Sequence, residues 1–539
     1  MPRDLDDLIR AAGADLEPDP DVTGRARARV LATRPRPSRR LRRMLQSRRG
    51  RTGMLAFGLL LAGGGATATV GVLTDRGGDG PPWRPLPQNC FALDGDTFAP
   101  PPLRNAVAVG TGGRPTVVWV AGDGTIASAD GQDDGRWGAP QALGDFGADA
   151  PGDAVALVGN TRGDMAVAWA ADHAIHVTVR PAGGSWSTPR RLSDDGRWVM
   201  NVEKPPLAVG PAGEVAVSWS DVAREDVTAA GEGYGISGPV AIRVATGRVD
   251  DSWGAPRVLE GFGDPFVSGP PAIAFDAEGV PIVVAPGGVP GVTVAELDPQ
   301  DGALVDGTKR RLTLPPLSRA LARGASFSGP VATTGADGTV VVGWSSNGIV
   351  TAAIRSPRGV WGQPARVSRP GAEANDVRFA VGADGRVAAV WSAVARDPAP
   401  GRPGRRSRTV SAAVRDAGER WEAPTLLSEE GDVVSAPDVA VATDGRVSVA
   451  WALGTNGISG RDSRVLAADR PATGAGWNAS VQVSENGLGP LFPTVAELAR
   501  GQRLIVWSRC DGHRQGTLRA ATGDDASTWS APAGVSGSG

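Results

Sequence analysis

Several residue types are scarce in this sequence, and each scarcity excludes a class of protein. Only two cysteines occur in 539 residues, which excludes a small disulfide-dense scaffold and a cysteine-based zinc cluster. Lysine occurs only at Lys204 and Lys309, and so strong a preference for arginine is typical of coding in high-GC genomes. Hydrophobic residues nevertheless make up 41% of the chain, so the protein can bury a large core and is not disordered over its whole length.

Histidine is also rare, and the sequence predicts neither a metal site nor a cofactor. His173 and His176 are three residues apart in a predicted strand, so we expect their side chains to point to opposite faces. The run from Asp94 to Asp96 is too short for a calcium loop. The sequence contains no phosphate loop, nucleophile elbow or HExxH motif.

Tryptophan, glycine and proline are abundant. Sixteen Trp, 76 Gly and 44 Pro indicate many short strands joined by tight turns. When the sequence is aligned on itself from residue 104 onward, fourteen of the tryptophans fall into two columns. The first column ends the second strand of a repeat unit and holds Trp119, Trp169, Trp219, Trp344, Trp391, Trp451 and Trp507. The second column precedes the fourth strand and holds Trp137, Trp186, Trp253, Trp361, Trp421, Trp477 and Trp529.

The two columns define a repeat of about four strands. A further unit without either tryptophan fits between residues 219 and 344, which gives eight units. Asp-Gly pairs at 337–338, 384–385 and 444–445 predict positive φ angles in the hairpin turn between the first two strands. Alternation puts Val117 and Trp119 on one face of a second strand and Val118 and Val120 on the other. Because both faces are apolar, both must be covered.

Four-stranded sheets that cover one another on both faces form a propeller. The predicted fold is therefore all-β, an eight-bladed β-propeller over residues 104–537, with seven blades as the alternative.

The charges before the repeat predict a membrane topology. Twelve arginines and no acidic residue lie between Arg25 and Arg51, directly before an uncharged stretch, residues 52–74. Basic residues beside an apolar span mark its cytoplasmic side. We therefore predict a basic cytoplasmic tail over 1–51, a transmembrane helix over 52–74, a Pro/Gly-rich linker over 75–103 and an extracytoplasmic propeller. The arginine run is assigned to topology and anionic lipid rather than to nucleic acid. The alternative is a cleaved signal sequence, because residues 66–68 have the small-x-small form that signal peptidase accepts.

The two cysteines flank the repeat. Cys90 lies just before the first unit, and Cys510 lies just after Trp507 in the last. In an exported protein, two such cysteines are predicted to form a disulfide, which would tie the N-terminal segment to the last blade. The entropic model puts its contribution in the upper part of ~2–4 kcal/mol. Two unpaired thiols are the alternative.

One turn resembles a known family motif. Residues 416–421, DAGERW, fit the D-x-G-x-x-W core of the Asp-box, and fragments of the motif occur at 133–137, 183–186 and 524–529. The repeat therefore resembles a degenerate Asp-box, or BNR-type, sialidase-like propeller. In that family the box is a structural turn on the face away from the active site, so the resemblance implies a fold and not catalysis. A sialidase-like glycoside hydrolase remains an alternative function, although the single Tyr234 lies in a Gly-rich loop beside Glu232, a poor setting for a nucleophile.

The distance between the two tryptophan columns measures loop length. It is 17 or 18 residues in units 1, 2 and 5, but 34, 30, 26 and 22 residues in units 3, 6, 7 and 8. The extra residues lie chiefly between the second and third strands, on the face that propellers usually use for ligands. Arginine-rich loops there suit an anionic ligand, and solvated loops without a ligand are the alternative. The candidate ligand-face residues are Tyr234, Arg402, Arg405, Arg406, Arg408, Arg461, Arg464, Arg509, His513 and Arg514.

These observations predict a single-pass membrane protein whose propeller binds or senses a glycan, a wall polymer or a protein. Catalysis is left open, with the balance against it. A second alternative is a transmembrane regulator whose tail binds a cytoplasmic partner. It is based on a short acidic helix predicted over residues 4–13, before a Pro/Arg linker and one span, which resembles membrane-anchored regulators of high-GC bacteria.

Overall fold

The computed structural model describes residues 105–535, except the internal segments 122–123, 133–135, 147–154, 201–204, 231–232, 237, 263–269, 288–290, 315–326, 370–372, 395–407, 430–432, 455–462, 475, 486–490, 511–515 and 525–527. Contacts divide the chain into residues 1–72 and 73–539, and all described residues belong to the second unit. None of the helices in the described part is long and apolar enough to cross a bilayer. The predicted tail, span and linker lie outside the described residues, as does Cys90, so the topology and the disulfide stay predictions.

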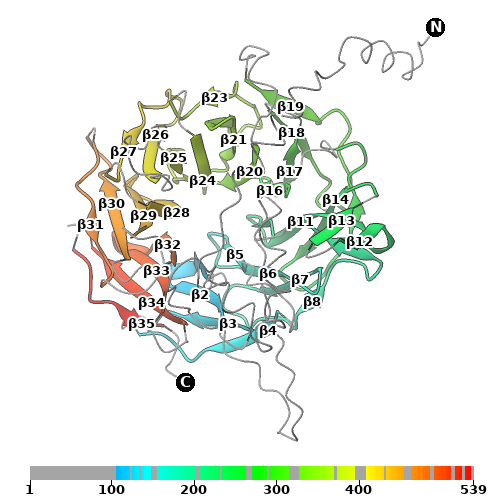
Figure 1. Ribbon diagram of the computed structural model, residues 1–539, viewed down its shortest axis with the longest axis horizontal. Helices are drawn as coiled ribbons and strands as arrows, with labels where there is room; N and C mark the ends of the chain where they lie inside the picture. The colour runs from blue at the N-terminus through cyan, green and yellow to red at the C-terminus, as the bar shows by residue number, and fades with distance from the viewer. Residues whose placement is uncertain are drawn as a thin grey trace, which may run out of the picture. The chain divides into compact units, whose positions relative to one another are not determined.

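The described residues form eight antiparallel blades arranged in a ring (Figure 1), seven with four strands and blade 3 with an additional strand, β9 (Arg197–Val199). The first four blades are β1 (Asn105–Val109), β2 (Pro115–Val120), β3 (Thr125–Asp130) and β4 (Gln141–Asp145); β5 (Ala156–Gly159), β6 (Met165–Ala171), β7 (Ala174–Arg180) and β8 (Arg190–Arg191); β10 (Leu207–Val209), β11 (Glu214–Ala223), β14 (Ala241–Arg248) and β15 (Arg257–Val258); and β16 (Ala272–Phe275), β17 (Pro281–Pro286), β18 (Gly291–Glu296) and β19 (Arg310–Thr313). The last of these is the unit without either tryptophan, and the structure confirms it as blade 4.

The other four blades follow the same order. They are β20 (Phe327–Thr334), β21 (Val340–Ser346), β22 (Ile349–Arg355) and β23 (Ala365–Arg366); β24 (Glu373–Val381), β25 (Val387–Val394), β26 (Arg408–Arg415) and β27 (Thr425–Leu426); β28 (Val433–Val441), β29 (Val447–Gly454), β30 (Arg464–Arg470) and β31 (Val481–Gln482); and β32 (Leu491–Glu497), β33 (Arg503–Cys510), β34 (Gly516–Gly523) and β35 (Ala533–Gly534). The structure thus confirms eight blades rather than seven.

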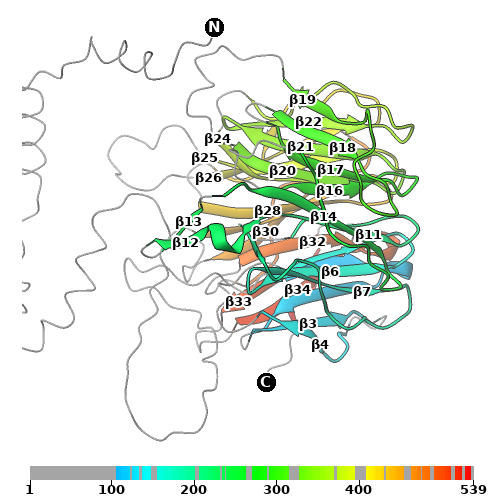
Figure 2. The same cartoon turned by 90° about the vertical axis from the view of Figure 1, so that its right-hand side faces the viewer.

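Each blade has two kinds of connection, on opposite faces of the ring. The turns between first and second strands and between third and fourth strands lie on one face, which we call the hairpin face. The loops between second and third strands and the blade-to-blade connections lie on the other, which we call the loop face. In blade 3, a second hairpin, β12 (Val227–Ala230) with β13 (Gly233–Ile236), projects on the loop face (Figure 2). The sequence predicted only a Gly-rich loop there, because glycines hide a short strand.

Both faces of each second strand are covered, as the alternation predicts. In β2, Val117 and Trp119 pack against β33 and β34 of blade 8, whereas Val118 and Val120 pack against blade 2. Six of the seven tryptophans in the first column are less than 2% exposed, namely Trp169, Trp219, Trp344, Trp391, Trp451 and Trp507. Replacing such a side chain by alanine typically costs about 3–5 kcal/mol, so these tryptophans form the core between blades.

The Asp-Gly turns differ in detail from the predicted geometry. The glycines Gly338, Gly385 and Gly445 have φ of 84°, 76° and 86°, but the aspartates before them are not among the residues with positive φ. Instead, each aspartate accepts a hydrogen bond from the backbone N–H two residues later, at 2.9 Å in Asp337, 3.0 Å in Asp384 and 2.9 Å in Asp444. The aspartate therefore stabilises the turn through its side chain, and only the glycine needs the left-handed conformation.

The ring closes between blades 1 and 8 without exchanging a strand, because each blade comes from one continuous segment. Asn105 in β1 donates to the Phe492 carbonyl at 3.3 Å and accepts from the Thr494 hydroxyl at 3.1 Å. Apolar packing of Val117 and Trp119 on Leu504 adds to these bonds. Side-chain hydrogen bonds and apolar packing therefore help to join blades 1 and 8 in the described chain.

Candidate functional site

The described part of the loop face contains three of the arginines that the sequence singled out. Arg408 begins β26, Arg464 begins β30 and Arg509 lies near the end of β33, so all three lie at the same edge of their blades. Six other candidates lie outside the described residues: Arg402, Arg405, Arg406, Arg461, His513 and Arg514. Tyr234 lies in β13, where only its backbone is described. These residues remain candidates for a ligand face.

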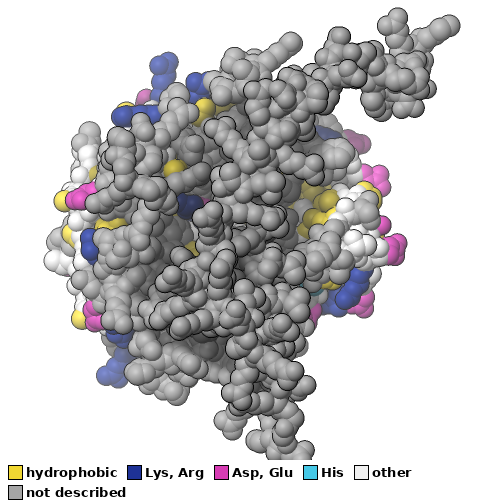
Figure 3. All heavy atoms as spheres, viewed as in Figure 1, with side chains coloured by type: hydrophobic (Ala, Val, Ile, Leu, Met, Phe, Trp, Pro, Cys, Tyr) yellow, Lys and Arg dark blue, Asp and Glu magenta, His cyan; other side chains and the backbone are white. Residues whose placement is uncertain are grey.

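Two of the three described arginines already have acidic partners. Arg408 lies 3.6 Å from the Asp376 carboxylate on the innermost strand of its own blade. Arg509 forms an ion pair with Glu485, and Arg519 lies 3.9 Å from the same carboxylate. Figure 3, which views the loop face, shows described basic and acidic side chains interspersed around the rim. These pairs neutralise part of the positive charge that the sequence predicts for blades 6 to 8.

Blade 3 contains a buried carboxylate on the same side. Asp221 in β11 is completely buried, with Arg197 Nε at 2.9 Å, Arg243 Nε at 2.7 Å and the Trp219 indole N–H at 3.0 Å. Arg197 belongs to β9 (Arg197–Val199), an added strand that pairs with β11. This cluster fixes the added strand to the blade, and the charge of Asp221 is compensated by both arginines. Arg243 also lies 3.8 Å from the exposed Asp194.

The two described histidines differ in secondary structure, whereas the sequence predicts both in one strand. His173 lies in a turn with φ of 57°, not in a strand, and stacks on Trp198 at 3.4 Å. His176 lies in β7 and stacks on Trp169 at 5.6 Å. Burial lowers the pKa of both imidazoles. The described residues contain no group of acidic, His or Cys side chains that could hold a metal ion.

On the hairpin face, arginines recur at the end of the third strand in several blades. The last residue of a third strand is an arginine in five blades, namely Arg180 in blade 2, Arg248 in blade 3, Arg355 in blade 5, Arg415 in blade 6 and Arg470 in blade 7. Each pairs in register with the first residue of the second strand of its blade. Arg248 is 49% exposed and lies 3.4 Å from Glu214 of its own blade. The other four, which we call the arginine row, are less exposed, and differences between them reflect their neighbours.

Three of these arginines bind a carboxylate of the preceding blade. Arg180 lies 2.9 Å from Asp130. Arg355 lies 3.0 Å from Asp276 and 2.8 Å from Glu296. Arg470 lies 2.5 Å from Glu422. The arginine side chains are between 4% and 12% exposed, whereas Asp130 and Glu422 are 55% and 45% exposed. Each pair therefore joins two blades, and only the Arg355–Asp276 pair is buried on both sides.

Arg415 is the exception. In blade 5, the equivalent position holds Arg355, whose guanidinium is bound to blade 4. Arg470 also follows an arginine in the row, but blade 6 supplies Glu422, the residue after Trp421. The equivalent residue of blade 5, after Trp361, is Gly362, which has no carboxylate. Within the described residues, Arg415 has no ion-pair partner within 4.0 Å and makes no side-chain hydrogen bond.

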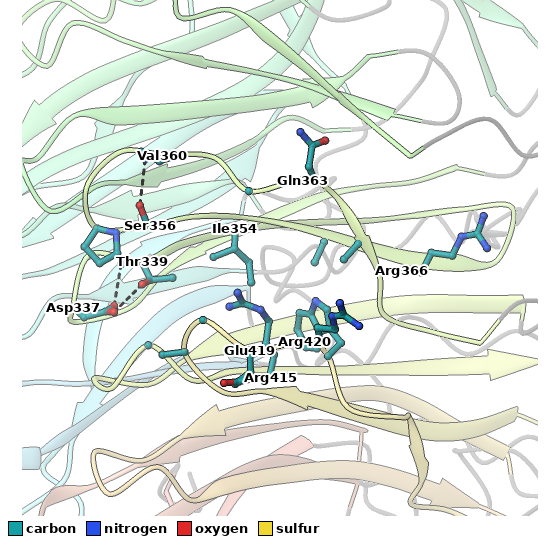
Figure 4. A pocket seen from close by; sticks show the side chains of 18 residues that line it. Asp337, Thr339, Ile354, Ser356, Val360, Gln363, Arg366, Arg415, Glu419 and Arg420 are labelled. Atoms are coloured by element: carbon teal, nitrogen blue, oxygen red, sulfur yellow. Dashed lines mark hydrogen bonds between the residues drawn. The ribbon is translucent and has the colours of Figure 1, made fainter.

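Arg415 lines an open cleft between blades 5 and 6. It has a volume of about 910 Å³ and lies between β22 and its following turn in blade 5 and the end of β26 in blade 6. Figure 4 shows Asp337, Thr339 and Ile354 on the blade 5 side and Arg415 and Glu419 on the blade 6 side. The volume falls within the range of about 300–1,000 Å³ that is usual for small-ligand sites.

The charge of the cleft favours an anion. Its charged lining residues are Asp337, Arg366, Arg415, Glu419 and Arg420, which leaves a formal charge of +1. Both carboxylate oxygens of Asp337 already accept hydrogen bonds from Thr339, at 2.9 and 2.7 Å. Burial lowers the pKa of the Arg415 guanidinium, and the nearby Glu419 carboxylate raises it. Arg415 is thus a partly desolvated cation without a bonded partner among the described residues, the arrangement that gains most from a charge-assisted hydrogen bond.

The turn that lines the cleft is the segment that resembles an Asp-box. Gly418 has φ of 77°, and the Glu419 N–H donates to the Asp416 carbonyl at 3.0 Å. The Asp416 carboxylate accepts from Arg386 Nε at 2.7 Å. Trp421, at the end of the turn, contacts Phe379 edge-on with ring centroids 6.2 Å apart. The turn is held rigidly at both ends, which fixes the blade 6 wall of the cleft.

Comparison with known proteins gives structural likenesses only. No family model matches the sequence, and no curated protein matches it significantly. Among solved structures, the chain is similar to the BP39L lectin from Burkholderia pseudomallei, with a TM-score of 0.45 and 16% identity over 80% of this chain and 98% of that chain. An ulvan lyase of polysaccharide lyase family PL25 gives a TM-score of 0.41 and 11% identity, with 67% and 90% covered. The NanB sialidase from Streptococcus pneumoniae gives a TM-score of 0.36 and 9% identity, with 76% and 83% covered. At these TM-scores and identities, none of the three indicates what this chain binds.

Proposed function

We propose that this protein is a binding module for an anionic ligand, displayed outside the membrane by an N-terminal anchor. The observation that carries the proposal is Arg415, a half-buried cation without a described partner, facing an open cleft between blades 5 and 6. Glycans, wall polymers and proteins all offer suitable anions. The membrane anchor over residues 52–74 rests on the charge pattern of the sequence, and the kinship with Asp-box propellers rests on residues 416–421.

The physical basis is the difference between arginines that are paired within the fold and one that is not. Each of the other three arginines in the row forms its charge-assisted hydrogen bonds when the blades pack. Arg415 gives up part of its hydration on folding without such a bond, and a charged group in this state is stabilised by a bound anion. Contacts of Asp337 with Thr339 and of Trp421 with Phe379 position parts of both walls before a ligand binds, which reduces the conformational freedom lost on binding.

A retention experiment tests the proposal. The full-length protein in detergent is passed over immobilised acidic glycans, wall polymers and acidic peptides, with neutral counterparts as references, and each ligand is also checked for turnover. We expect retention on at least one anionic ligand, weaker at higher salt, and a loss of about tenfold or more in Arg415→Ser. Arg358→Ser is the matched control, because Arg358 is exposed in the turn beside the cleft but does not line it.

Two outcomes would refute the proposal. One is the absence of binding to every anionic ligand, and the other is binding that Arg415→Ser leaves unchanged. Thermal unfolding followed by tryptophan fluorescence checks that the variant is folded. For the anchor, protease treatment of intact cells that express a C-terminally tagged chain should remove the tag, whereas a released, shortened fragment would indicate a cleaved signal sequence instead.

A further inference from the structure

The ion pairs elsewhere in the row show what kind of group fits beside these arginines. In every case, the partner is an aspartate or glutamate side chain: Asp130, Asp276, Glu296 or Glu422. The pair in blade 2 is bidentate, with Arg180 Nη1 at 3.1 and 2.9 Å from the two oxygens of Asp130 and Nη2 at 3.1 Å from the first. In the other blades of the row, a protein carboxylate binds the equivalent arginine. A carboxylate is therefore the group that fits beside Arg415.

The rest of the cleft is suited to an apolar side chain. Ile354 and Trp421 are half-buried in its walls, and Val360 at its rim is 66% exposed, the most exposed of the large hydrophobic residues in the described chain. The edge-on contact with Phe379 holds Trp421 in place. A ligand with an apolar group beside its anion would cover Val360 as it binds.

The carboxylates of the cleft limit the charge of the ligand. Glu419 and Asp337 line the same cleft as Arg415. These carboxylates repel a phosphate group, with a charge near −2, more strongly than they repel a single carboxylate, with a charge of −1.

We propose, on the basis of the binding function above, that the cleft takes an acidic peptide segment of a partner protein. The carboxylate of an aspartate or glutamate forms a bidentate pair with Arg415, and an adjacent apolar side chain packs on Val360, Ile354 and Trp421. The segment thereby takes the place of the carboxylate that blade 5 lacks. The site lies on the hairpin face, so it is separate from the arginine-rich loops of the loop face.

The test is a double-mutant cycle with synthetic peptides. Three fluorescent 12-residue peptides carry Glu-Leu, Gln-Leu or Glu-Ser at the centre of a Gly/Ser background, and their binding to the full-length protein in detergent is measured by anisotropy at low salt. We expect the Glu-Leu peptide to bind about tenfold more tightly than the Gln-Leu peptide and more tightly than the Glu-Ser peptide. In Arg415→Ser the ratio between Glu-Leu and Gln-Leu falls to about one, whereas in Arg358→Ser it stays at the wild-type value.

The outcomes separate this proposal from the more general one. Equal binding of the Glu-Leu and Gln-Leu peptides to the wild-type protein, or a ratio that Arg415→Ser does not change, would overturn the peptide assignment. A parallel arm measures a uronic-acid hexasaccharide. If it binds in an Arg415-dependent way and the Glu-Leu peptide does not, the anion-binding function stands and the peptide assignment is wrong. If no anionic probe binds, both proposals are wrong.

Discussion

Glu497 provides a direct test of the electrostatics on the hairpin face. It ends β32, and its side chain is 11% exposed. One carboxylate oxygen accepts from the Ser448 hydroxyl at 2.8 Å, while the other lies 3.7 Å from Arg446 and accepts no hydrogen bond. Burial raises the pKa of Glu497 from 4.5 to about 7, against the opposing effects of Ser448, Arg446 and Arg503. The carboxyl group is therefore largely protonated in the folded protein at mildly acidic pH.

The sign of the pH dependence follows from this shift. Between the unfolded pKa of 4.5 and the folded pKa of about 7, the folded state binds the proton and the unfolded state does not. The contribution to stability is fully present below the unfolded pKa and is lost as pH rises through the folded pKa. At 1.36 kcal/mol per pKa unit, the loss is on the order of 3 kcal/mol. We expect Glu497→Gln, which cannot ionise, to escape most of this loss.

The variant should thus match the wild type near pH 5 and be more stable at pH 8. For a propeller of this size, 3 kcal/mol corresponds to roughly 3 °C in Tm. The measurement is urea and thermal unfolding by tryptophan fluorescence between pH 4.5 and 8.5. Glu278→Gln is the control, because Glu278 is exposed in the corresponding turn of blade 4. Parallel pH profiles for Glu497→Gln and the wild type would refute the reasoning.

Three further changes probe other parts of the ring. Asp221→Asn leaves two arginines around a buried position without a countercharge, so urea unfolding should show a loss of about 3–5 kcal/mol, and a loss below about 1 kcal/mol would contradict this account. Asn105→Ala removes both side-chain hydrogen bonds of Asn105 across the closing seam, so it should lower the free energy of unfolding by about 1–3 kcal/mol. Proteolysis at the seam should also become faster, and an unchanged rate of proteolysis would contradict this prediction. Gly343→Ala places a Cβ against the Phe379 ring, whereas Gly196→Ala meets nothing within 4 Å, so only the first should lower Tm, by an amount equivalent to about 1–3 kcal/mol.

The sequence was sufficient for the blade architecture because the signal repeats. Trp119 and its counterparts recur at fixed distances, and the alternation of Val117 with Val118 indicates which residues face each neighbouring blade. Even blade 4, without either tryptophan, could be placed by its strands alone. Blade number and core residues depend on a local pattern that recurs in each blade. Such a pattern can be recognised in the sequence without knowing which residues contact each other in the folded protein.

The cleft could not be found in the same way, because it depends on relations between neighbouring units. Arg355, Arg415 and Arg470 look alike in the sequence, and Arg470, like Arg415, follows an arginine in the preceding blade. The carboxylates that bind Arg355 and Arg470 come from different places: Glu296 ends a third strand, whereas Asp276 and Glu422 lie outside the strands. The pairing therefore cannot be predicted from a single column of the repeat. Loop lengths can be measured in the sequence, and the long loops lie between second and third strands, on the opposite face.

Pairing of an arginine with a carboxylate therefore stabilises the fold at Arg355 in blade 5 and is available for ligand binding at Arg415 in blade 6. Arg355 binds Asp276 and Glu296 when the ring folds, so removing it leaves a buried carboxylate unpaired and should cost about 3–5 kcal/mol. Arg415 forms no such bond within the described residues, so removing it should cost little stability. Whatever pairing energy Arg415 can supply is still available after folding, and only a bound anion can use it. A ligand at the cleft should consequently raise the stability of the wild type by mass action, and that stabilisation should be absent in Arg415→Ser.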